Sequence, residues 1–177
     1  ILFLGGFQGF LGWYMVKSGL IKNPDVSHYR LAMHLITAFI TFAYTFWVAL
    51  QVWFFDSKKK AHPLKKYLVI LLPLLLTQIV WGAYVAGLNA GKVYNTWPKM
   101  GGQWVADGVT AIEPWWLNFV EGIAGVQFFH RYLAYVLVFI VVMFFFKARK
   151  FKLNKNQRIG INLLIGVVSL QFILGVF

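Results

Sequence analysis

Five long apolar runs dominate this sequence and leave few folds open to it. A helix that crosses a bilayer needs about 20 mostly apolar residues. The runs near that length cover residues 1–17, 31–55, 67–88, 126–146 and 159–177. They lack the polar–apolar alternation of barrel strands, and backbone groups in lipid must be satisfied within their own segment. We therefore expect an all-α integral membrane protein, a helical bundle with five transmembrane segments in this chain.

Composition agrees with a membrane location. Hydrophobic residues make up 60% of the chain and charged residues only 12%, whereas a soluble domain carries about 25% charged residues. The net charge of +12 would indicate nucleic acid in a soluble protein, but here the cations gather in short loops between apolar runs. The lipid bilayer is therefore the expected partner, and nucleic acid is not. The absence of cysteine excludes thiolate chemistry.

The cations indicate an orientation. They are concentrated at residues 58–66 and 147–158, and the positive-inside rule places both loops on the cytoplasmic or matrix side. Residues 89–125, the outer segment, then lie on the opposite side. Their tryptophans suit either an interfacial belt or a lid over a site between helices, and composition does not decide between them. Pro73 is expected to kink the run at 67–88.

A weak internal repeat is present in three of the runs. A Gln and a Gly four residues apart share a helix face, where the Gly permits close approach and the Gln offers a hydrogen bond. The three pairs are Gln8 and Gly12, Gln78 and Gly82, and Gln171 and Gly175. The runs between them each carry a histidine near the outer end. The pattern favours a duplicated helical unit.

Two of these histidines are candidates for chemistry. His34 follows Arg30 by four residues, and His130 directly precedes Arg131. Ionisable groups within membrane segments are functional hypotheses by default. A neutral imidazole is a common axial ligand of haem iron, and a guanidinium suits the carboxylates of haem propionates. The alternative for each histidine is an interfacial hydrogen-bonding residue.

The other polar candidates have weaker patterns. His28 lies in an outer loop and His62 in a lysine-rich loop, where both are expected to be ordinary solvated or interfacial residues. Glu121 could orient a ligand, anchor its loop through an arginine, or be solvated. No Ser/His/Asp group, phosphate loop or HExxH pattern is present, so hydrolases and nucleotide-driven functions have no support.

Four motifs, in order along nearly the whole chain, carry a family resemblance. They are QGFLGWYMVKSGL at 8–20, YRLAMHL at 29–35, GAYVAGLNAG with YNTWPKM at 82–100, and QFFHRYLAY at 127–135. They resemble the third to sixth helices of haem A synthases of the mitochondrial and proteobacterial type. That family has eight helices in two similar four-helix halves, so the resemblance implies that this chain covers the third to the seventh helix.

The resemblance also implies a division of the chain. Residues 1–56 correspond to the second part of the N-terminal half, 57–66 to a basic inside linker, and 67–177 to most of the C-terminal half. The family's catalytic Glu lies on its second helix, so no catalytic residue is expected in this chain. The chain is expected to be a fragment at both ends, and inactive alone.

The implied activity is oxidation of the C8 methyl group of haem O to a formyl group, which gives haem A for cytochrome oxidase. Haem B is the implied cofactor, and haem O and haem A are the implied substrate and product. We expect His34 to ligate the substrate haem and His130 the cofactor haem. Further haem-binding candidates are Arg30, Arg131, Gln8, Gln78 and Trp97, with residues 95–100 folded over a haem edge.

Two other functions fit the residues. A bis-histidine cytochrome b-type electron-transfer subunit would use the same histidines, and a small-solute transporter is a third option, for which no coupling carboxylate is present inside the membrane runs. For the synthase, the implied location is the bacterial inner (plasma) membrane, multi-pass, or the mitochondrial inner membrane. Haem O synthase and terminal oxidase assembly factors are the implied partners; the sequence does not indicate the electron donor or acceptor.

Overall fold

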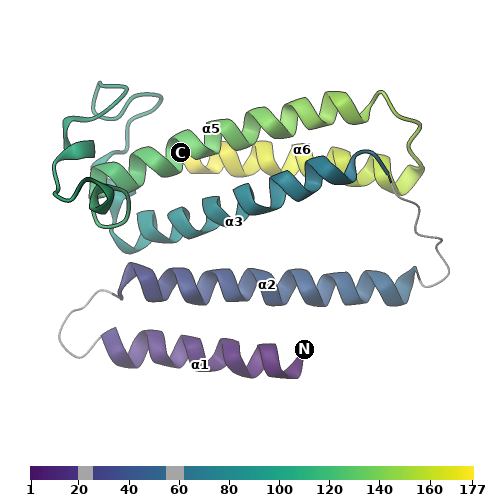
Figure 1. Ribbon diagram of the computed structural model, residues 1–177, viewed down its shortest axis with the longest axis horizontal. Coiled ribbons are helices and arrows are strands. Elements are labelled where there is room, and N and C mark those ends of the chain that lie inside the picture. Colours follow the sequence, from purple (N-terminus) through teal and green to yellow (C-terminus); the bar gives the residue numbers. More distant parts are fainter. Residues whose placement is uncertain (20–25, 55–61) are drawn as a thin grey trace.

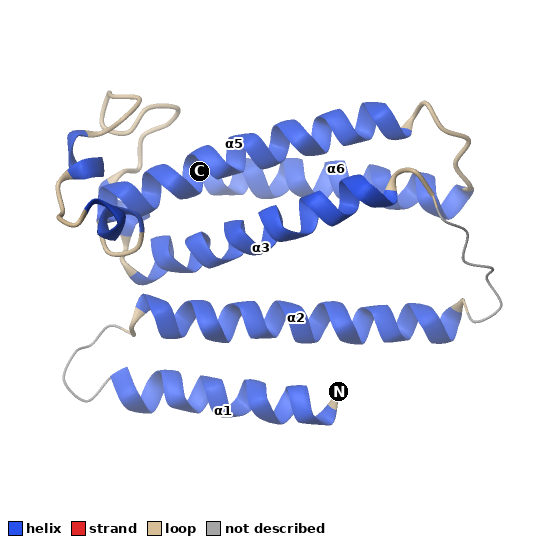
Figure 2. Cartoon of the chain, in the orientation of Figure 1, coloured by secondary structure: helices blue, strands red, loops and turns tan. Residues whose placement is uncertain are grey.

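A computed structural model describes residues 1–19, 26–54 and 62–177 of the chain, and these residues form a bundle of long helices (Figure 1). No strand occurs within the three described ranges (Figure 2). The long helices are α1 (Leu2–Gly19), α2 (His28–Trp53), α3 (Lys65–Gly87), α5 (Ile123–Ala148) and α6 (Lys155–Val176). The all-α fold expected from the sequence is confirmed.

Four of these helices, α2, α3, α5 and α6, are long and apolar enough to cross a membrane. The protein is therefore a multi-pass membrane protein, and four of the five predicted segments are confirmed. The first predicted segment is helical, but α1 contains Gln8, Lys17 and several glycines and is not among the helices that are long and apolar enough to cross a membrane. Its crossing stays a prediction.

The helices extend beyond the apolar runs that predicted them. α2 begins at His28 and not near residue 31, and α6 begins at Lys155 and not near residue 159. At the start of α6, Asn154 and Gln157 form a capping box in which each side chain bonds the other residue's backbone N–H. Such caps satisfy the first N–H groups with polar side chains, so helix ends reach past the apolar residues.

The helices pack largely in chain order. α1 packs on α2, α2 on α3, α3 on α5, and α5 on α6 (Figure 1). α2 and α3 approach closely at Gly87, where a Cβ atom would lie only 2.6 Å from the Cβ of His28. The absence of a side chain at Gly87 therefore brings the helix pair α1–α2 against the remaining helices.

One end of the bundle carries most of the cations. The start of α3 and the turn between α5 and α6 lie at this end (Figure 1), here named the basic end. They share an apolar cluster that includes Leu64, Phe144 and Ala148. The prediction that the two basic loops share one end is confirmed for the described residues; residues 58–60 lie outside them.

The outer segment lies at the opposite end and is folded. It contains α4 (Ala90–Val93), η1 (Asp107–Thr110) and η2 (Trp115–Phe119). The fully buried side chain of Asn118 exchanges hydrogen bonds with the backbone of Ile112 and donates a further one to the carbonyl of Trp115. A small core of Met100, Ala106, Val109 and Ala124 lies beneath these turns.

Candidate functional site

The first histidine site lies between α1 and α2. Gln8 places its side-chain nitrogen 3.1 Å from Nδ1 and 3.3 Å from Nε2 of His34, and also 3.1 Å from the backbone oxygen of His34. One turn along α1, a Cβ atom at Gly12 would lie 3.1 Å from Cε1 of the same ring. The imidazole is therefore held between a glutamine amide and a glycine.

The second histidine site repeats this arrangement between α3 and α5. The side-chain nitrogen of Gln78 lies 3.2 Å from Nδ1 and 3.3 Å from Nε2 of His130. A Cβ atom at Gly82 would lie 3.2 Å from Cε1 of that ring. The Gln–His and Gly–His distances of the two sites agree within a few tenths of an ångström. The weak repeat of the sequence is therefore a structural repeat. We name each copy a Gln–Gly–His module.

Among the described residues, the ring nitrogens of each module have no hydrogen-bond partner other than the glutamine amide. The N–H and lone-pair directions of the two nitrogens diverge in the ring plane. One amide nitrogen at nearly equal distance from both therefore lies over the ring face and not along either direction. His34 and His130 can each offer an in-plane nitrogen to a metal, which is the donor that haem iron requires.

The glutamine amide oxygens are a second shared feature. Oε1 of Gln8 and Oε1 of Gln78 are both buried, and neither has a hydrogen-bond partner among the described residues. Buried polar groups are normally paired, because an unpaired one loses its hydration without compensation. The same acceptor in both modules fits a donor supplied by a bound group or by the rest of a longer protein.

The third Gln–Gly pair of the sequence lies on α6. Gln171 is exposed, and within the described chain nothing lies within 4 Å of the position of a Cβ atom at Gly175. Of the three pairs, the first two form modules among the described residues, and the third presents its face outward from the bundle.

The two predicted arginines have different surroundings. The guanidinium carbon of Arg30 lies 5.3 Å from the centroid of the Tyr14 ring on α1, which is a cation–π distance. Arg131 donates hydrogen bonds to backbone carbonyls of the outer segment. The accepting oxygens belong to Tyr94 at 3.1 Å, Thr96 at 2.7 Å, Pro98 at 3.4 Å and Lys99 at 3.2 Å. This clamp on the main chain was not predicted from the sequence.

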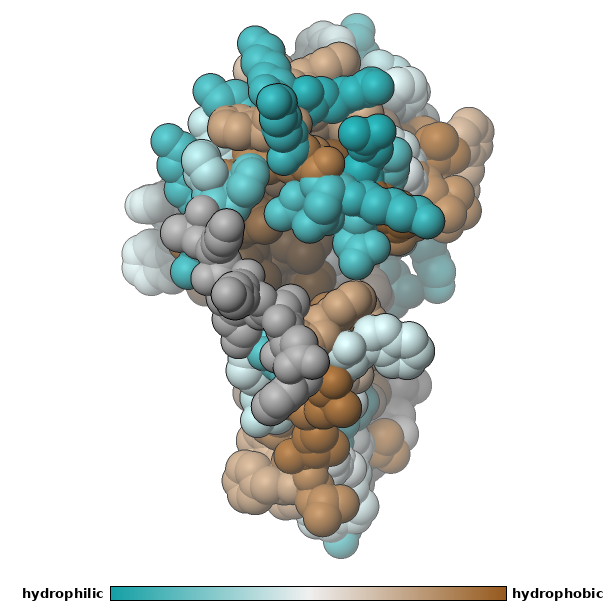
Figure 3. Space-filling view, turned by 90° about the vertical axis from the view of Figure 1, so that its right-hand side faces the viewer, coloured by the Kyte–Doolittle hydropathy of each residue, from teal (hydrophilic) through white to brown (hydrophobic). Residues whose placement is uncertain are grey.

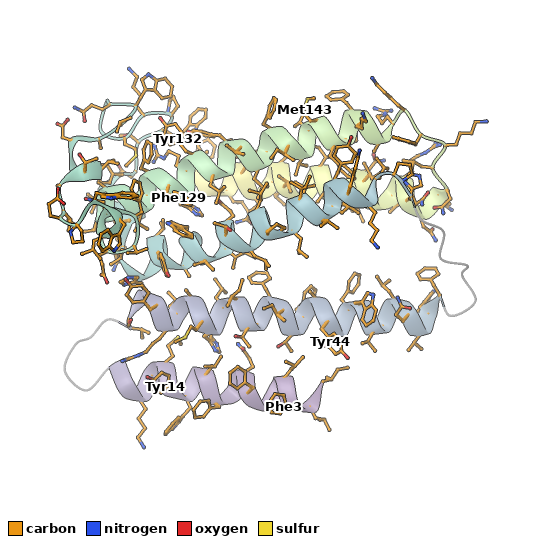
Figure 4. All side chains as sticks on the ribbon, viewed as in Figure 1. Phe3, Tyr14, Tyr44, Phe129, Tyr132 and Met143 are labelled. Carbon is orange, nitrogen blue, oxygen red and sulfur yellow. The ribbon has the colours of Figure 1, made fainter. Side chains whose placement is uncertain are left out.

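Two tyrosines of α5 add to the clamp. Tyr132 donates to the carbonyl of Trp104 at 2.8 Å and projects toward the outer segment in Figure 4. Tyr135 lies 3.5 Å from the carbonyl of Pro98. Residues 94–104 thus fold back onto α5, while Trp97 and Trp104 stay about half exposed, so both the lid and the belt interpretation remain open for this stretch.

Trp97 lies on the folded-back stretch. Its side chain is exposed and borders a hollow of about 450 Å³ between the outer segment and the last turns of α6. The other lining residues are Asn95, Phe172, Ile173, Val176 and Phe177. The structure places Trp97 beside an open apolar surface, and contact of Trp97 with a haem edge stays a prediction.

The other two histidines, His28 and His62, lie outside the modules and have different surroundings. His28 is the first residue of α2, not a loop residue, and it is only 8% exposed because Gly87 lets α3 pack against its backbone. His62 is half-buried: its ring lies 5.5 Å from the Phe151 ring, and its Nδ1 accepts a hydrogen bond from the backbone N–H of Leu64. The expectation that His28 is an exposed loop residue was wrong, because loop polarity does not reveal what packs over a residue. His62 is only partly buried, so its expected contact with solvent is not contradicted.

Glu121 joins the helix pair α1–α2 to the outer segment. It accepts a hydrogen bond from the Tyr29 hydroxyl at 2.5 Å, and its other carboxylate oxygen lies 3.7 Å from Nε2 of His28. The Tyr84 ring packs edge-on against both His28 and Tyr29. The carboxylate thus anchors its segment through the hydroxyl of Tyr29, with His28 nearby, and not through the arginine that was one of the predicted options.

Aromatic side chains of α3 and α5 pack beside the second module. Phe129 of α5 lies against Trp81 of α3 with ring centroids 4.4 Å apart (Figure 4), and the Trp81 indole donates to the carbonyl of Phe119. These contacts fix α3 and α5 beside His130. The fold and the two modules define a class: a multi-pass helical membrane protein with two equivalent histidine sites, one in each of two helix pairs.

The chain belongs to the COX15-CtaA family of cytochrome oxidase assembly proteins, whose model matches residues 1–177. It is 49% identical to a haem A synthase of Flavobacterium johnsoniae over 100% of the chain and 53% of that protein. It is 48% identical to one of Flavobacterium psychrophilum, over 99% and 52%, and 39% identical to one of Nitrosomonas eutropha, over 99% and 51%. The chain therefore spans about half the length of these relatives. No solved structure matches the chain.

Proposed function

We propose that the full-length protein is a haem A synthase, which oxidises the C8 methyl group of haem O to a formyl group. The observation that carries the proposal is the duplicated Gln–Gly–His module, which gives two separate helix pairs the same accessible imidazole. Relatives named haem A synthase match the whole chain. Iron in a bound haem supplies the oxidising chemistry, which no side chain performs on an unactivated methyl group.

In this proposal His34 ligates the substrate haem and His130 ligates haem B, the cofactor. Gln8 and Gln78 hold the ring orientations, because an amide over one face and a glycine at one edge restrict rotation of each imidazole. Fixed orientation directs a ring nitrogen at the iron and lowers the entropic cost of ligation. The histidines belong to different helix pairs, so they serve different irons.

The arginines and Trp97 act at the outer edges of these sites. Arg30 at the outer end of α2 is proposed to pair with a propionate of the substrate haem. Arg131, beside His130, is proposed to pair with a propionate of the cofactor haem. Its hydrogen bonds to the carbonyls of residues 94–99 also hold the stretch that contains Trp97. One guanidinium has five N–H donors, enough for a main-chain clamp and a carboxylate together.

The division of the chain follows the same proposal. Residues 1–56 belong to the N-terminal half, 57–66 to the linker, of which 57–61 lie outside the described residues, and 67–177 to the C-terminal half. Since the relatives are about twice as long as the chain, any further ligand of each haem and the catalytic carboxylate would come from the remainder of the full-length protein.

The proposed setting is the inner (plasma) membrane of a bacterium, or the mitochondrial inner membrane in a eukaryote. Haem O synthase as supplier of substrate and terminal oxidase assembly factors as receivers of haem A are the proposed partners. A bis-histidine cytochrome b-type electron relay would use the same modules, but the names of the relatives favour the synthase.

Extraction of haem from the purified full-length protein tests the proposal. We expect haem O or haem A together with haem B, identified by chromatography and mass. Haem B alone would overturn the synthase in favour of the electron relay. A protein free of haem after expression in a haem O-producing host would exclude both.

A further inference from the structure

The basic end has an unusual charge distribution. Lys65 and Lys66 begin α3, and six further lysines and arginines lie between Lys147 and Arg158; all eight are exposed. Figure 3 shows the hydrophilic side chains gathered over this end. The carboxylates of the described residues, Asp107, Glu113 and Glu121, all belong to the outer segment at the opposite end. Within the described residues, no acid offsets the positive charge of the basic end.

Two of these cations converge on one aromatic ring. Nζ of Lys66 lies 5.3 Å from the centroid of the Tyr67 ring, and Nζ of Lys147, from α5, lies 5.9 Å from it. Each contact is weakly favourable, but two ammonium groups about one ring repel each other. An anion that contacts both ammonium groups would offset this repulsion.

The helix starts strengthen the attraction for anions. The first turn of α3 contains Lys65 and Lys66 and no acid, and the first turn of α6 contains Lys155 and no acid. Helix N-termini carry partial positive charge, which ordinarily favours acidic residues. Cations in these turns add to that charge.

The position of Tyr67 points to a lipid as the source of the anion. Its ring packs against Phe144, 6.2 Å between centroids, above the buried Leu64 and Ala148. The residues that follow on α3, Leu68, Val69 and Ile70, are about half exposed on a helix apolar enough to cross a membrane. Along α3, the lysines of the first turn are thus followed directly by an exposed apolar surface. This order of charge and apolar surface is complementary to a lipid with a phosphate headgroup and acyl chains.

We propose that Lys66, Tyr67 and Lys147 bind the headgroup phosphate of an anionic phospholipid, with its acyl chains against the exposed apolar residues that follow on α3. The site is separate from both Gln–Gly–His modules and does not depend on the haem chemistry. It would hold one lipid between α3 and α5 at the basic end and so fasten the start of α3 to the end of α5.

Native mass spectrometry of the full-length protein in detergent, titrated with dioleoylphosphatidylglycerol, measures binding of the first lipid. A lysine near an anionic headgroup contributes about fivefold in affinity. Lys66→Gln/Lys147→Gln should therefore raise the dissociation constant about 25-fold. The control Lys150→Gln/Lys152→Gln makes the same change in charge at the same end and should change it less than about twofold. Equal thermal unfolding midpoints establish that both variants are folded.

Four outcomes would overturn the site. Equal losses in the two double variants would mean general attraction by the basic end. Equal binding of phosphatidylglycerol and dioleoylphosphatidylcholine by the unsubstituted protein would remove the anionic preference. Displacement of the lipid by millimolar inorganic phosphate would mean a phosphate-ion site. Loss of haem A production in cells carrying Lys66→Gln/Lys147→Gln, without any lipid preference in the unsubstituted protein, would assign the face to an acidic protein partner.

Discussion

Alanine at Gly82 is the sharpest perturbation of a Gln–Gly–His module. The added Cβ atom would lie 3.2 Å from Cε1 of His130, some tenths of an ångström inside ordinary contact. Either the ring moves away from Gln78 or α3 and α5 separate slightly. Crowding of a packed interface costs about 1–3 kcal/mol, whereas replacing glycine by alanine within a helix gains about 0.5–1 kcal/mol.

The matched control is Gly166→Ala on α6, where, in the described part of the chain and apart from the local helix backbone, nothing lies within 4 Å of the added Cβ atom. The two substitutions share the change in helix propensity and differ in the crowding. Gly82→Ala should therefore be about 1–3 kcal/mol less stable than Gly166→Ala. Reversible unfolding of the full-length protein in mixed detergent and dodecyl sulfate micelles, followed by circular dichroism, measures this difference.

A second measurement separates a local effect from a general loss of stability. The shift of the His130 ring should change the absorption and electron paramagnetic resonance spectra of one haem and leave the other unchanged. Gly12→Ala, whose Cβ atom would lie 3.1 Å from Cε1 of His34, should change the other haem instead. Equal stability of Gly82→Ala and Gly166→Ala, with unchanged spectra, would refute the packing argument.

Three further substitutions test the α2–α3 contact, the fold of the outer segment and the role of Trp97. Gly87→Ala would place a Cβ atom 2.6 Å from Cβ and 2.7 Å from Cα of His28. The free energy of unfolding should fall by about 3 kcal/mol or more in the same assay. A variant as stable as the unsubstituted protein would contradict the α2–α3 packing. Arg131→Gln removes hydrogen bonds to the outer segment worth about 1.5–3 kcal/mol. Limited proteolysis within residues 95–104 should therefore become faster while helical content is retained. Arg149→Gln is the exposed control, and equal cleavage rates in the two variants would show that Arg131 does not hold the segment. Trp97→Ala should lower haem retention without unfolding the helices, and unchanged haem content with unchanged turnover would reduce Trp97 to an interfacial anchor.

The helices could be predicted because the bilayer requires long apolar runs, and those runs are local in the sequence. The Gln–Gly pairs could also be predicted, because spacing of four places both residues on one helix face. Which histidine each pair would hold was not predictable from spacing. Gln8 and His34 lie on different helices, and only the packing of α1 on α2 brings them together.

The roles of Arg131 and Glu121 could not be predicted for a different reason. Arg131 binds backbone carbonyls, and every residue has a carbonyl, so side-chain identity carries no signal for its partners. Glu121 meets Tyr29 across 92 positions of sequence. A useful signal existed in Gly87 at the end of an apolar run, because a glycine there permits close approach of another helix.

The most direct test of the central claim, that the two modules serve separate irons, compares His34→Ala and His130→Ala in the full-length protein. The haems are followed by electron paramagnetic resonance and by reductive titration. We predict that each substitution removes or shifts the signal of a different haem, and that the double variant shows the sum of the two changes, because distant sites act independently. Loss of one and the same low-spin haem in both single variants would contradict the claim and support a single bis-histidine centre.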